Sequence, residues 1–287
     1  MRQRISDRNK FPTFSIAKEY DKLDDLFHNR GAFGRILVVT QRARPNISYY
    51  DCIRNMFLDW ELRGSFTTLE EMMEALAISV EDFADGVTEE RLLDYIQFLA
   101  NAVVYVDASV RGSDYTIYRA NEAIGDVLAE NCQYILEYLG AEMVREGQEI
   151  VVVYRDDVAT AVKEQNPDLS GSIVEYQKID NRGDLQRKGE ILCTLAKKLE
   201  PLEPQFKGTE FNPLCTDTTM LFNNIGARHA WKPEHSVSSQ FMSMDEAELE
   251  GWYDNAFKMF LACMSVLPYL DVKPELKLLK SGNGTLK

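Results

Sequence analysis

The sequence has few long apolar runs. A membrane-spanning helix needs about 20 consecutive apolar residues. The longest candidate here, residues 259–270, is interrupted by Ser265 and Pro268. The N-terminal residues 1–11 are basic but are not followed by the apolar core of a secretory signal. We therefore expect a cytoplasmic protein with no membrane partner.

Cysteine and histidine are also scarce. The five cysteines (Cys52, Cys132, Cys193, Cys215 and Cys263) are odd in number, widely spaced and form no CxxC pair. This pattern predicts buried free thiols instead of a disulfide framework or a zinc site. The glycine-rich GxGxxG and GxxxxGK[ST] loops and the GxSxG elbow are missing as well. We expect neither a bound metal nor a cofactor.

Basic side chains are fewer than acidic ones. The chain of 287 residues holds 46 acidic and 32 basic side chains, for a net charge of −14, and both termini are locally basic. Broad, non-specific binding of nucleic acid needs many cations that face phosphates. The acidic body argues against such binding but leaves room for a small basic site.

What is present indicates a mostly α-helical protein, because apolar residues recur at helical spacing through most of the chain. In the N-terminal half the pattern predicts helices over residues 17–30, 49–62, 68–76 and from 88 onward. The runs at residues 103–106 and 115–118 are rich in β-forming residues and predict a small hairpin.

Three helices followed by a hairpin outline a winged helix. Its recognition region, residues 61–94, holds ten carboxylates against Arg63 and Arg91, which is a poor surface for a DNA groove. An interaction module therefore fits better than a DNA-binding regulator. The DNA-binding alternative would use Arg111 and Arg119 on the wing.

The C-terminal half adds a helix over residues 121–143, a strand at 150–154 and a linker near 166–183. Helices then follow at 184–199, at 213–231 and from a capping box at Ser243 to Leu267, where Pro268 ends the last one. The predicted organisation is a flexible arm (1–14), a helical and β-ribbon domain (15–120), a helix, strand and linker (121–183), a helical domain (184–270) and a flexible tail (271–287).

One segment concentrates chemically useful side chains. Between residues 221 and 235 lie Asn223, Asn224, Arg228, His229, Lys232 and His235. A histidine can hold or release a proton near neutral pH, and an arginine fork matches a phosphate group. Arg228 and His235, with six residues between them, are the pair that metal-free RNA cleavage requires: the imidazole as acid or base, and the guanidinium on the phosphate.

The same segment has an alternative interpretation. Arginine and histidine near the C-terminal end of a helix interact favourably with the helix dipole without any further function. The spacing alone is weak evidence, and Pro233 prevents a continuous helical face between Arg228 and His235.

Two motifs carry a resemblance to a known family. The sequence K-G-E-I-L at 188–192, followed by F-N-N-I-G-A-R-H at 222–229, resembles the C-terminal HEPN-type domain of bacterial abortive-infection proteins of the AbiJ-like group. The similarity covers residues 120–270. It implies a HEPN-like helical bundle that forms a homodimer and places two arginine–histidine motifs across the interface as a composite ribonuclease site.

By this resemblance Arg228 is the motif arginine, His229 the polar residue after it and His235 the motif histidine. Asn223, Asn224 and Lys232 become substrate contacts or supports for the motif. The resemblance implies a toxin of antiviral defence, with the acidic N-terminal domain as a sensor that binds a protein partner. Some HEPN domains are non-catalytic dimerisation modules, and an interaction protein remains the alternative.

Overall fold

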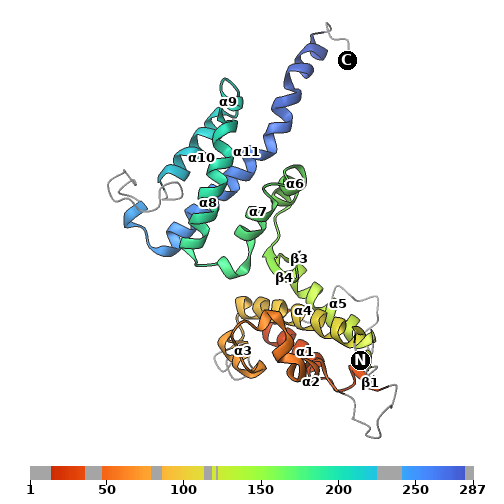
Figure 1. Ribbon diagram of the computed structural model, residues 1–287. Coiled ribbons are helices and arrows are strands. Elements are labelled where there is room, and N and C mark those ends of the chain that lie inside the picture. The colour runs from red at the N-terminus through yellow and green to blue at the C-terminus, as the bar shows by residue number, and fades with distance from the viewer. Residues whose placement is uncertain are drawn as a thin grey trace, which may run out of the picture. The chain divides into compact units, whose positions relative to one another are not determined.

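The computed structural model describes residues 14–35, 47–78, 86–112, 118–120, 122–224 and 241–281. The protein is mostly α-helical with a small antiparallel hairpin, which confirms the predicted fold class. It divides into two compact units, Met1–Tyr154 and Arg155–Lys287 (Figure 1). In the described ranges no helix is both long and apolar enough to cross a membrane.

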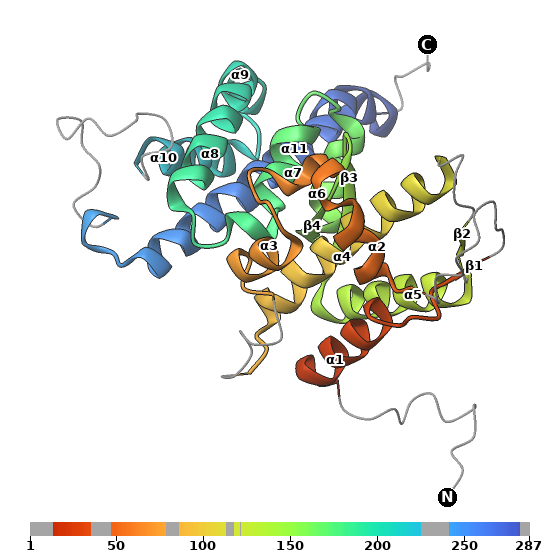
Figure 2. The same ribbon diagram turned by 60° about the horizontal axis from the view of Figure 1, so that its bottom comes forward.

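The N-terminal unit is built around one long helix. Its elements are α1 (Ile16–Phe27), β1 (Phe33–Arg35), α2 (Tyr49–Met56), α3 (Leu69–Ala75), α4 (Glu89–Gly112), β2 (Tyr118–Ala120), α5 (Glu122–Leu139), β3 (Ala141–Glu146) and β4 (Glu149–Tyr154). Helix α4 packs against α1, α2, α5 and β4, and the turned view shows α1, α2 and α5 grouped around it (Figure 2).

Polar side chains cap the first turns of α2 and α3. Thr68 accepts a hydrogen bond from the Glu71 N–H at 3.1 Å and begins α3. The Glu71 carboxylate reaches back to the Thr67 N–H and hydroxyl, each at 2.9 Å. Local side-chain hydrogen bonds of this kind satisfy free N–H groups of a first turn.

The predicted hairpin at residues 103–118 is wrong, because α4 continues through residues 103–112. Leu92, Ile96, Leu99, Ala102 and Val106 are fully buried at helical spacing. This continuous apolar stripe outweighs the β propensity of the valines. The stretch expected to form a wing therefore lies partly in a helix, with Arg111 in the last turn of α4.

The observed small sheets lie elsewhere. Strand β2, which contains Arg119, pairs with β1, and β3 pairs with β4. The helix expected over 121–143 ends earlier, at Leu139, because Gly140 adopts a left-handed conformation with φ of 68°. Met143 then lies in β3. The strand predicted at 150–154 is confirmed as β4.

The edge of β4 that faces away from β3 is covered by side chains of α4. The Asn101 carboxamide donates to the Ile150 carbonyl and accepts from the Ile150 N–H, both at 2.7 Å. Gln97 accepts from the Val152 N–H, also at 2.7 Å. These bonds replace a third strand and protect an edge that would otherwise expose unpaired backbone groups.

The C-terminal unit is helical. Its elements are α6 (Asp157–Gln165), α7 (Ser170–Gln177), α8 (Leu185–Leu199), α9 (Glu203–Phe206), α10 (Asn212–Asn224) and α11 (Glu246–Lys280). Helices α8, α10 and α11 lie side by side around one apolar core (Figure 1). Residues 166–183, where a linker was expected, include α7, and its Ile173 and Tyr176 belong to this core.

Helix α11 differs from the prediction at both ends. Its N-cap is Asp245, which accepts from the Glu248 N–H at 2.8 Å, in place of Ser243. The helix passes through Pro268 and Pro274 to Lys280, so residues 271–280 of the expected tail are helical. Tyr269 packs edge-on against Phe211, with 5.9 Å between the ring centroids. This contact holds the helix beyond a proline that removes one backbone hydrogen bond.

The Asn101 bridge yields a test of the N-terminal unit. Replacement of Asn101 by leucine leaves the Ile150 N–H and carbonyl unpaired, which we expect to cost about 1–3 kcal/mol of stability. Hydrogen exchange at Ile150 and Val152, followed by mass spectrometry, should accelerate in this variant. Asn131→Leu is the matched control, because within the described part of the chain the Asn131 amide bonds only to the Val127 carbonyl of its own helix. Equal exchange in both variants would contradict the bridge.

Candidate functional site

One face of α10 lines an open pocket of about 360 Å³. Seven residues of α10 contribute to it, at helical spacing, and two residues beside them come from α9 and its end. The lining consists of Asn212, Cys215, Thr216, Thr219, Met220, Asn223 and Asn224, with Glu203 and Lys207.

The buried face of α10 explains why its polar face lines the pocket. Leu221 and Phe222 are buried in the core, and the Phe222 ring lies 6.3 Å from that of Phe260 on α11. Thr218 is fully buried and donates to the Leu214 carbonyl at 2.7 Å. Because these apolar side chains face the core, the more polar positions between them must face outward.

The second wall of the pocket is held by α9. Phe206 is fully buried and anchors this short helix in the core. The Thr219 hydroxyl on α10 donates to the Glu203 carboxylate on α9 at 3.0 Å, and this hydrogen bond connects the two helices that line the pocket. Glu203 and Lys207 therefore occupy defined positions beside the polar face of α10.

The pocket offers hydrogen bonding and one charge of each sign. Among the described residues, no carboxylate forms an ion pair with the exposed Lys207 ammonium. Burial, reinforced by the neighbouring Cys263, raises the pKa of the Cys215 thiol to about 11. Cys215 is thus protonated at neutral pH and is a poor nucleophile. The lining suits a polar ligand that is held by amides, hydroxyls and one cation.

Two of the predicted site residues lie at this pocket. Asn223 and Asn224 form the last turn of α10, where the Asn224 amide donates to the Met220 carbonyl at 2.7 Å. Arg228, His229, Lys232 and His235 lie outside the described residues. The predicted motif thus continues directly from the end of the helix that lines the pocket.

Sequence reasoning missed the other lining residues, Glu203 and Lys207 among them. A signal for the α10 part was available: polar or small residues recur at positions 212, 215, 216, 219, 223 and 224 of a helix. Nothing in the sequence indicates that α9 lies beside this face. Within the described ranges, no three His, Cys, Asp or Glu side chains converge as metal ligands would.

A second polar cluster lies between α8 and α11. Lys188 is only 6% exposed, and its ammonium donates to Glu250 at 2.7 Å and to Asp254 at 2.8 Å. The Tyr176 hydroxyl also donates to Asp254 at 2.8 Å, and the Lys188 nitrogen lies 5.3 Å from the centre of the Tyr176 ring. These contacts join α7, α8 and α11 at a single buried cation.

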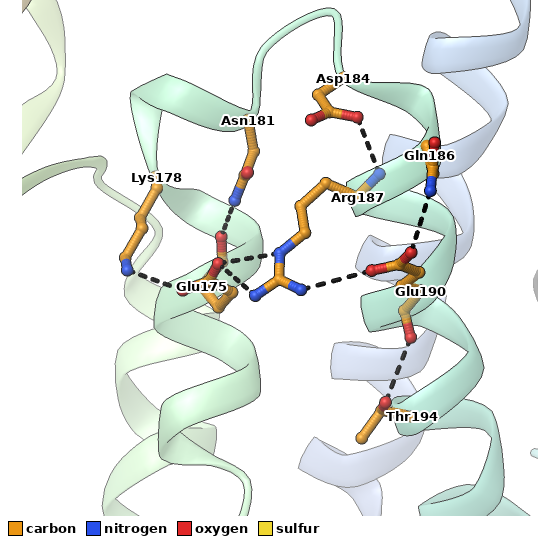
Figure 3. Close-up of polar contacts among 8 residues, drawn as sticks. All are labelled: Glu175, Lys178, Asn181, Asp184, Gln186, Arg187, Glu190 and Thr194. Carbon is orange, nitrogen blue, oxygen red and sulfur yellow. Dashed lines mark hydrogen bonds and ion pairs between the residues drawn. The ribbon is translucent and has the colours of Figure 1, made fainter.

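The charged residues next to this cation link α7 to α8 (Figure 3). Arg187 contacts Glu175 through two nitrogens, at 3.1 and 2.8 Å, and Glu190 at 3.4 Å. Lys178 also pairs with Glu175 at 2.7 Å. Burial works against ionisation of Glu175, but Lys178 and Arg187 outweigh it and lower its pKa. The charges in this cluster neutralise one another, which is the arrangement of a structural support.

These contacts also account for the K-G-E-I-L motif. Lys188 forms the buried ion pairs, Ile191 and Leu192 enter the core, and a side chain at Gly189 would meet the Tyr253 ring at 3.4 Å. This part of the resemblance is explained by packing. The α10 pocket and the residues that follow it are therefore the candidate site.

Comparisons with protein-family models, with curated proteins and with solved structures find no match for this chain.

The buried cation yields a second test. Lys188→Met should cost about 2 kcal/mol of stability, because Glu250 and Asp254 lose their partner while solvent still reaches both carboxylates. Lys198→Met, which removes only an exposed pair with Asp168, should cost less than about 1 kcal/mol. Urea denaturation followed by circular dichroism measures both.

The stability lost in Lys188→Met should depend on pH in a defined direction. Burial opposes ionisation of Glu250, but the Gly183 N–H and Lys188 outweigh it and lower the pKa of Glu250 below its ordinary 4.5. A lowered carboxyl pKa contributes stability above the ordinary value, and this contribution disappears as the pH falls through the folded pKa. The difference between wild type and Lys188→Met should therefore narrow below about pH 4.5. A difference that stays constant would contradict the ion pair.

Proposed function

We propose that this protein is a HEPN-like, metal-independent endoribonuclease of cytoplasmic antiviral defence, which acts as an abortive-infection toxin. The sequence resemblance and the arginine–histidine motif support this function. The observation that carries the proposal is the position of Asn223 and Asn224, which line a polar pocket at the end of α10. The chain enters the Arg228–His235 segment four residues later.

In the proposed reaction the ribose 2′-oxygen attacks the adjacent phosphorus and the bond to the 5′-oxygen breaks, which leaves a 2′,3′-cyclic phosphate and a free 5′-hydroxyl. His235 either accepts the 2′-hydroxyl proton while water protonates the leaving 5′-oxygen, or donates a proton to that oxygen while water accepts the 2′-hydroxyl proton. Arg228 binds the phosphate oxygens as charge develops on them. No metal participates in these steps.

The pocket would hold the nucleotide next to the scissile bond. Asn223 and Asn224 would contact its base or sugar, while Lys207 would contact a neighbouring phosphate. His229 and Lys232 would complete this surface. Single-stranded RNA is recognised through exposed base edges and backbone contacts, which amides and one cation can provide. The acidic N-terminal unit would regulate activity through a protein partner, because it repels nucleic acid.

Loss of the two motif side chains tests the activity. Arg228→Ala and His235→Ala should each reduce cleavage of a fluorescent RNA, measured in EDTA, by about 100-fold or more, because acid–base and charge stabilisation disappear. His28→Ala is the matched control: His28 lies in the N-terminal unit, 3.3 Å from Asp24, and its loss should leave the rate unchanged.

Two outcomes would contradict this proposal. Wild-type protein without RNA cleavage or toxicity would favour the alternative of a non-catalytic interaction protein. Cleavage that survives both motif substitutions would assign the activity to other residues.

RNA binding can be tested separately from cleavage. In a His235→Ala background, Lys207→Ala should weaken binding of a short single-stranded RNA. It should also lower the slope of log K against log salt by about 0.7, the value for one lost phosphate contact. Fluorescence anisotropy at several salt concentrations measures both quantities. Lys258→Ala is the control, because Lys258 is exposed on α11 and does not line the pocket. Equal effects of the two lysines would contradict the pocket as the RNA site.

A further inference from the structure

The C-terminal end of α11 exposes an apolar stripe. Tyr269, Val272, Leu276 and Leu279 are 42%, 46%, 38% and 44% exposed, respectively. They follow one another at intervals of three, four and three residues along a single helix. This spacing is that of the a and d positions of a coiled coil, which form the contact line between two helices.

Tyr269 still packs against Phe211, and Lys273 pairs with Glu210, but the part of α11 after Lys273 has left the core of its own unit. Leu270 is the last residue of the helix that packs against the apolar core, and every residue from Pro274 to Lys280 is exposed. In Figure 1 the last turns of α11 run away from α8 and α10. These last turns extend a long helix and need no new nucleus, but they lack tertiary packing, and Pro274 removes one of their backbone hydrogen bonds. A partner along the apolar stripe would supply the missing stabilisation.

We propose that this stripe pairs with the same stripe of a second copy of the chain, as a short parallel coiled coil around a two-fold axis. In this register Tyr269 and Leu276 occupy a positions, and Val272 and Leu279 occupy d positions. A stripe with this spacing is complementary to itself, which is the property that a two-fold interface requires. The seam does not depend on ribonuclease activity.

The charges beside the stripe favour a second copy in parallel orientation. Glu275 occupies a g position, and Lys280, five residues later, occupies an e position. In a parallel pair each g residue meets the e residue of the partner helix that lies five positions further on, so two Glu–Lys pairs form. In an antiparallel pair Glu275 would face a second Glu275. Among the described residues neither Glu275 nor Lys280 has an ion-pair partner.

The fifth exposed apolar residue provides an internal control. Leu278 is the most exposed of this group, at 55%, but it occupies a c position on the outer side of the pair. Its substitution changes the same surface chemistry without touching the proposed contact line.

The experiment measures the mass of the full chain by analytical ultracentrifugation. Wild type should be a dimer. The double variant Leu276→Glu/Leu279→Glu should raise the dissociation constant of the dimer by at least about tenfold, because two carboxylates from each chain would enter an apolar seam. Leu278→Glu should remain as dimeric as wild type. Circular dichroism confirms that each variant is folded, which is expected because all three leucines are exposed.

Orientation is tested by charge and by cross-linking. Glu275→Lys and Lys280→Glu should each weaken the dimer, and the double exchange should restore it, which an antiparallel pair would not do. In a Cys193→Ser background, Leu276→Cys should form a disulfide with its own copy, since a positions face each other across a parallel seam. Leu278→Cys should not.

Four results would overturn the proposal. They are a monomeric wild type, a dimer that tolerates the Leu276/Leu279 variant, equal loss with Leu278→Glu, and a monomer that binds anionic lipid vesicles through the stripe. A dimer that lacks RNA cleavage would contradict the proposed function while leaving this inference intact. Cleavage by a monomer would overturn this inference and the composite site, and would leave only the chemistry of Arg228 and His235.

Discussion

Burial of one face of α10 is the constraint on which the C-terminal unit and its pocket depend. Leu221 and Phe222 must enter the core shared with α8 and α11, so the remaining positions of the helix face α9 and solvent. The pocket is therefore a consequence of helix packing. Its lining repeats with the period of the helix, and its polar character follows from the residues that the core does not use.

The buried Lys188 sets a different kind of constraint. A cation that is almost fully enclosed must be neutralised, and here Glu250 and Asp254 on α11 meet that need. Such a pair is weak evidence for net stability, but here it joins α8 to α11 at two defined positions. The K-G-E-I-L motif thus belongs to the contact between α8 and α11. The proposed RNA cleavage would instead use the second motif, at residues 222–229, and His235.

The two proposals concern separate parts of the C-terminal unit. The α10 pocket and its motif would supply RNA chemistry, and the exposed end of α11 would supply association. A HEPN-like composite site needs two chains close together, and a coiled-coil seam would raise the local concentration of one chain near the other. Each proposal is tested by substitutions of its own residues.

The sequence by itself determined features that depend on neighbours along the chain. Helix α8 and strand β4 followed from local patterning. Asn223 and Asn224 were singled out because they adjoin a charged motif. Only the tertiary structure decided that residues 103–106 are helical, that α11 passes Pro268 and that Lys207 borders the pocket. The physical reason is that burial against distant segments outweighs local propensity, and a linear pattern does not record which segments meet.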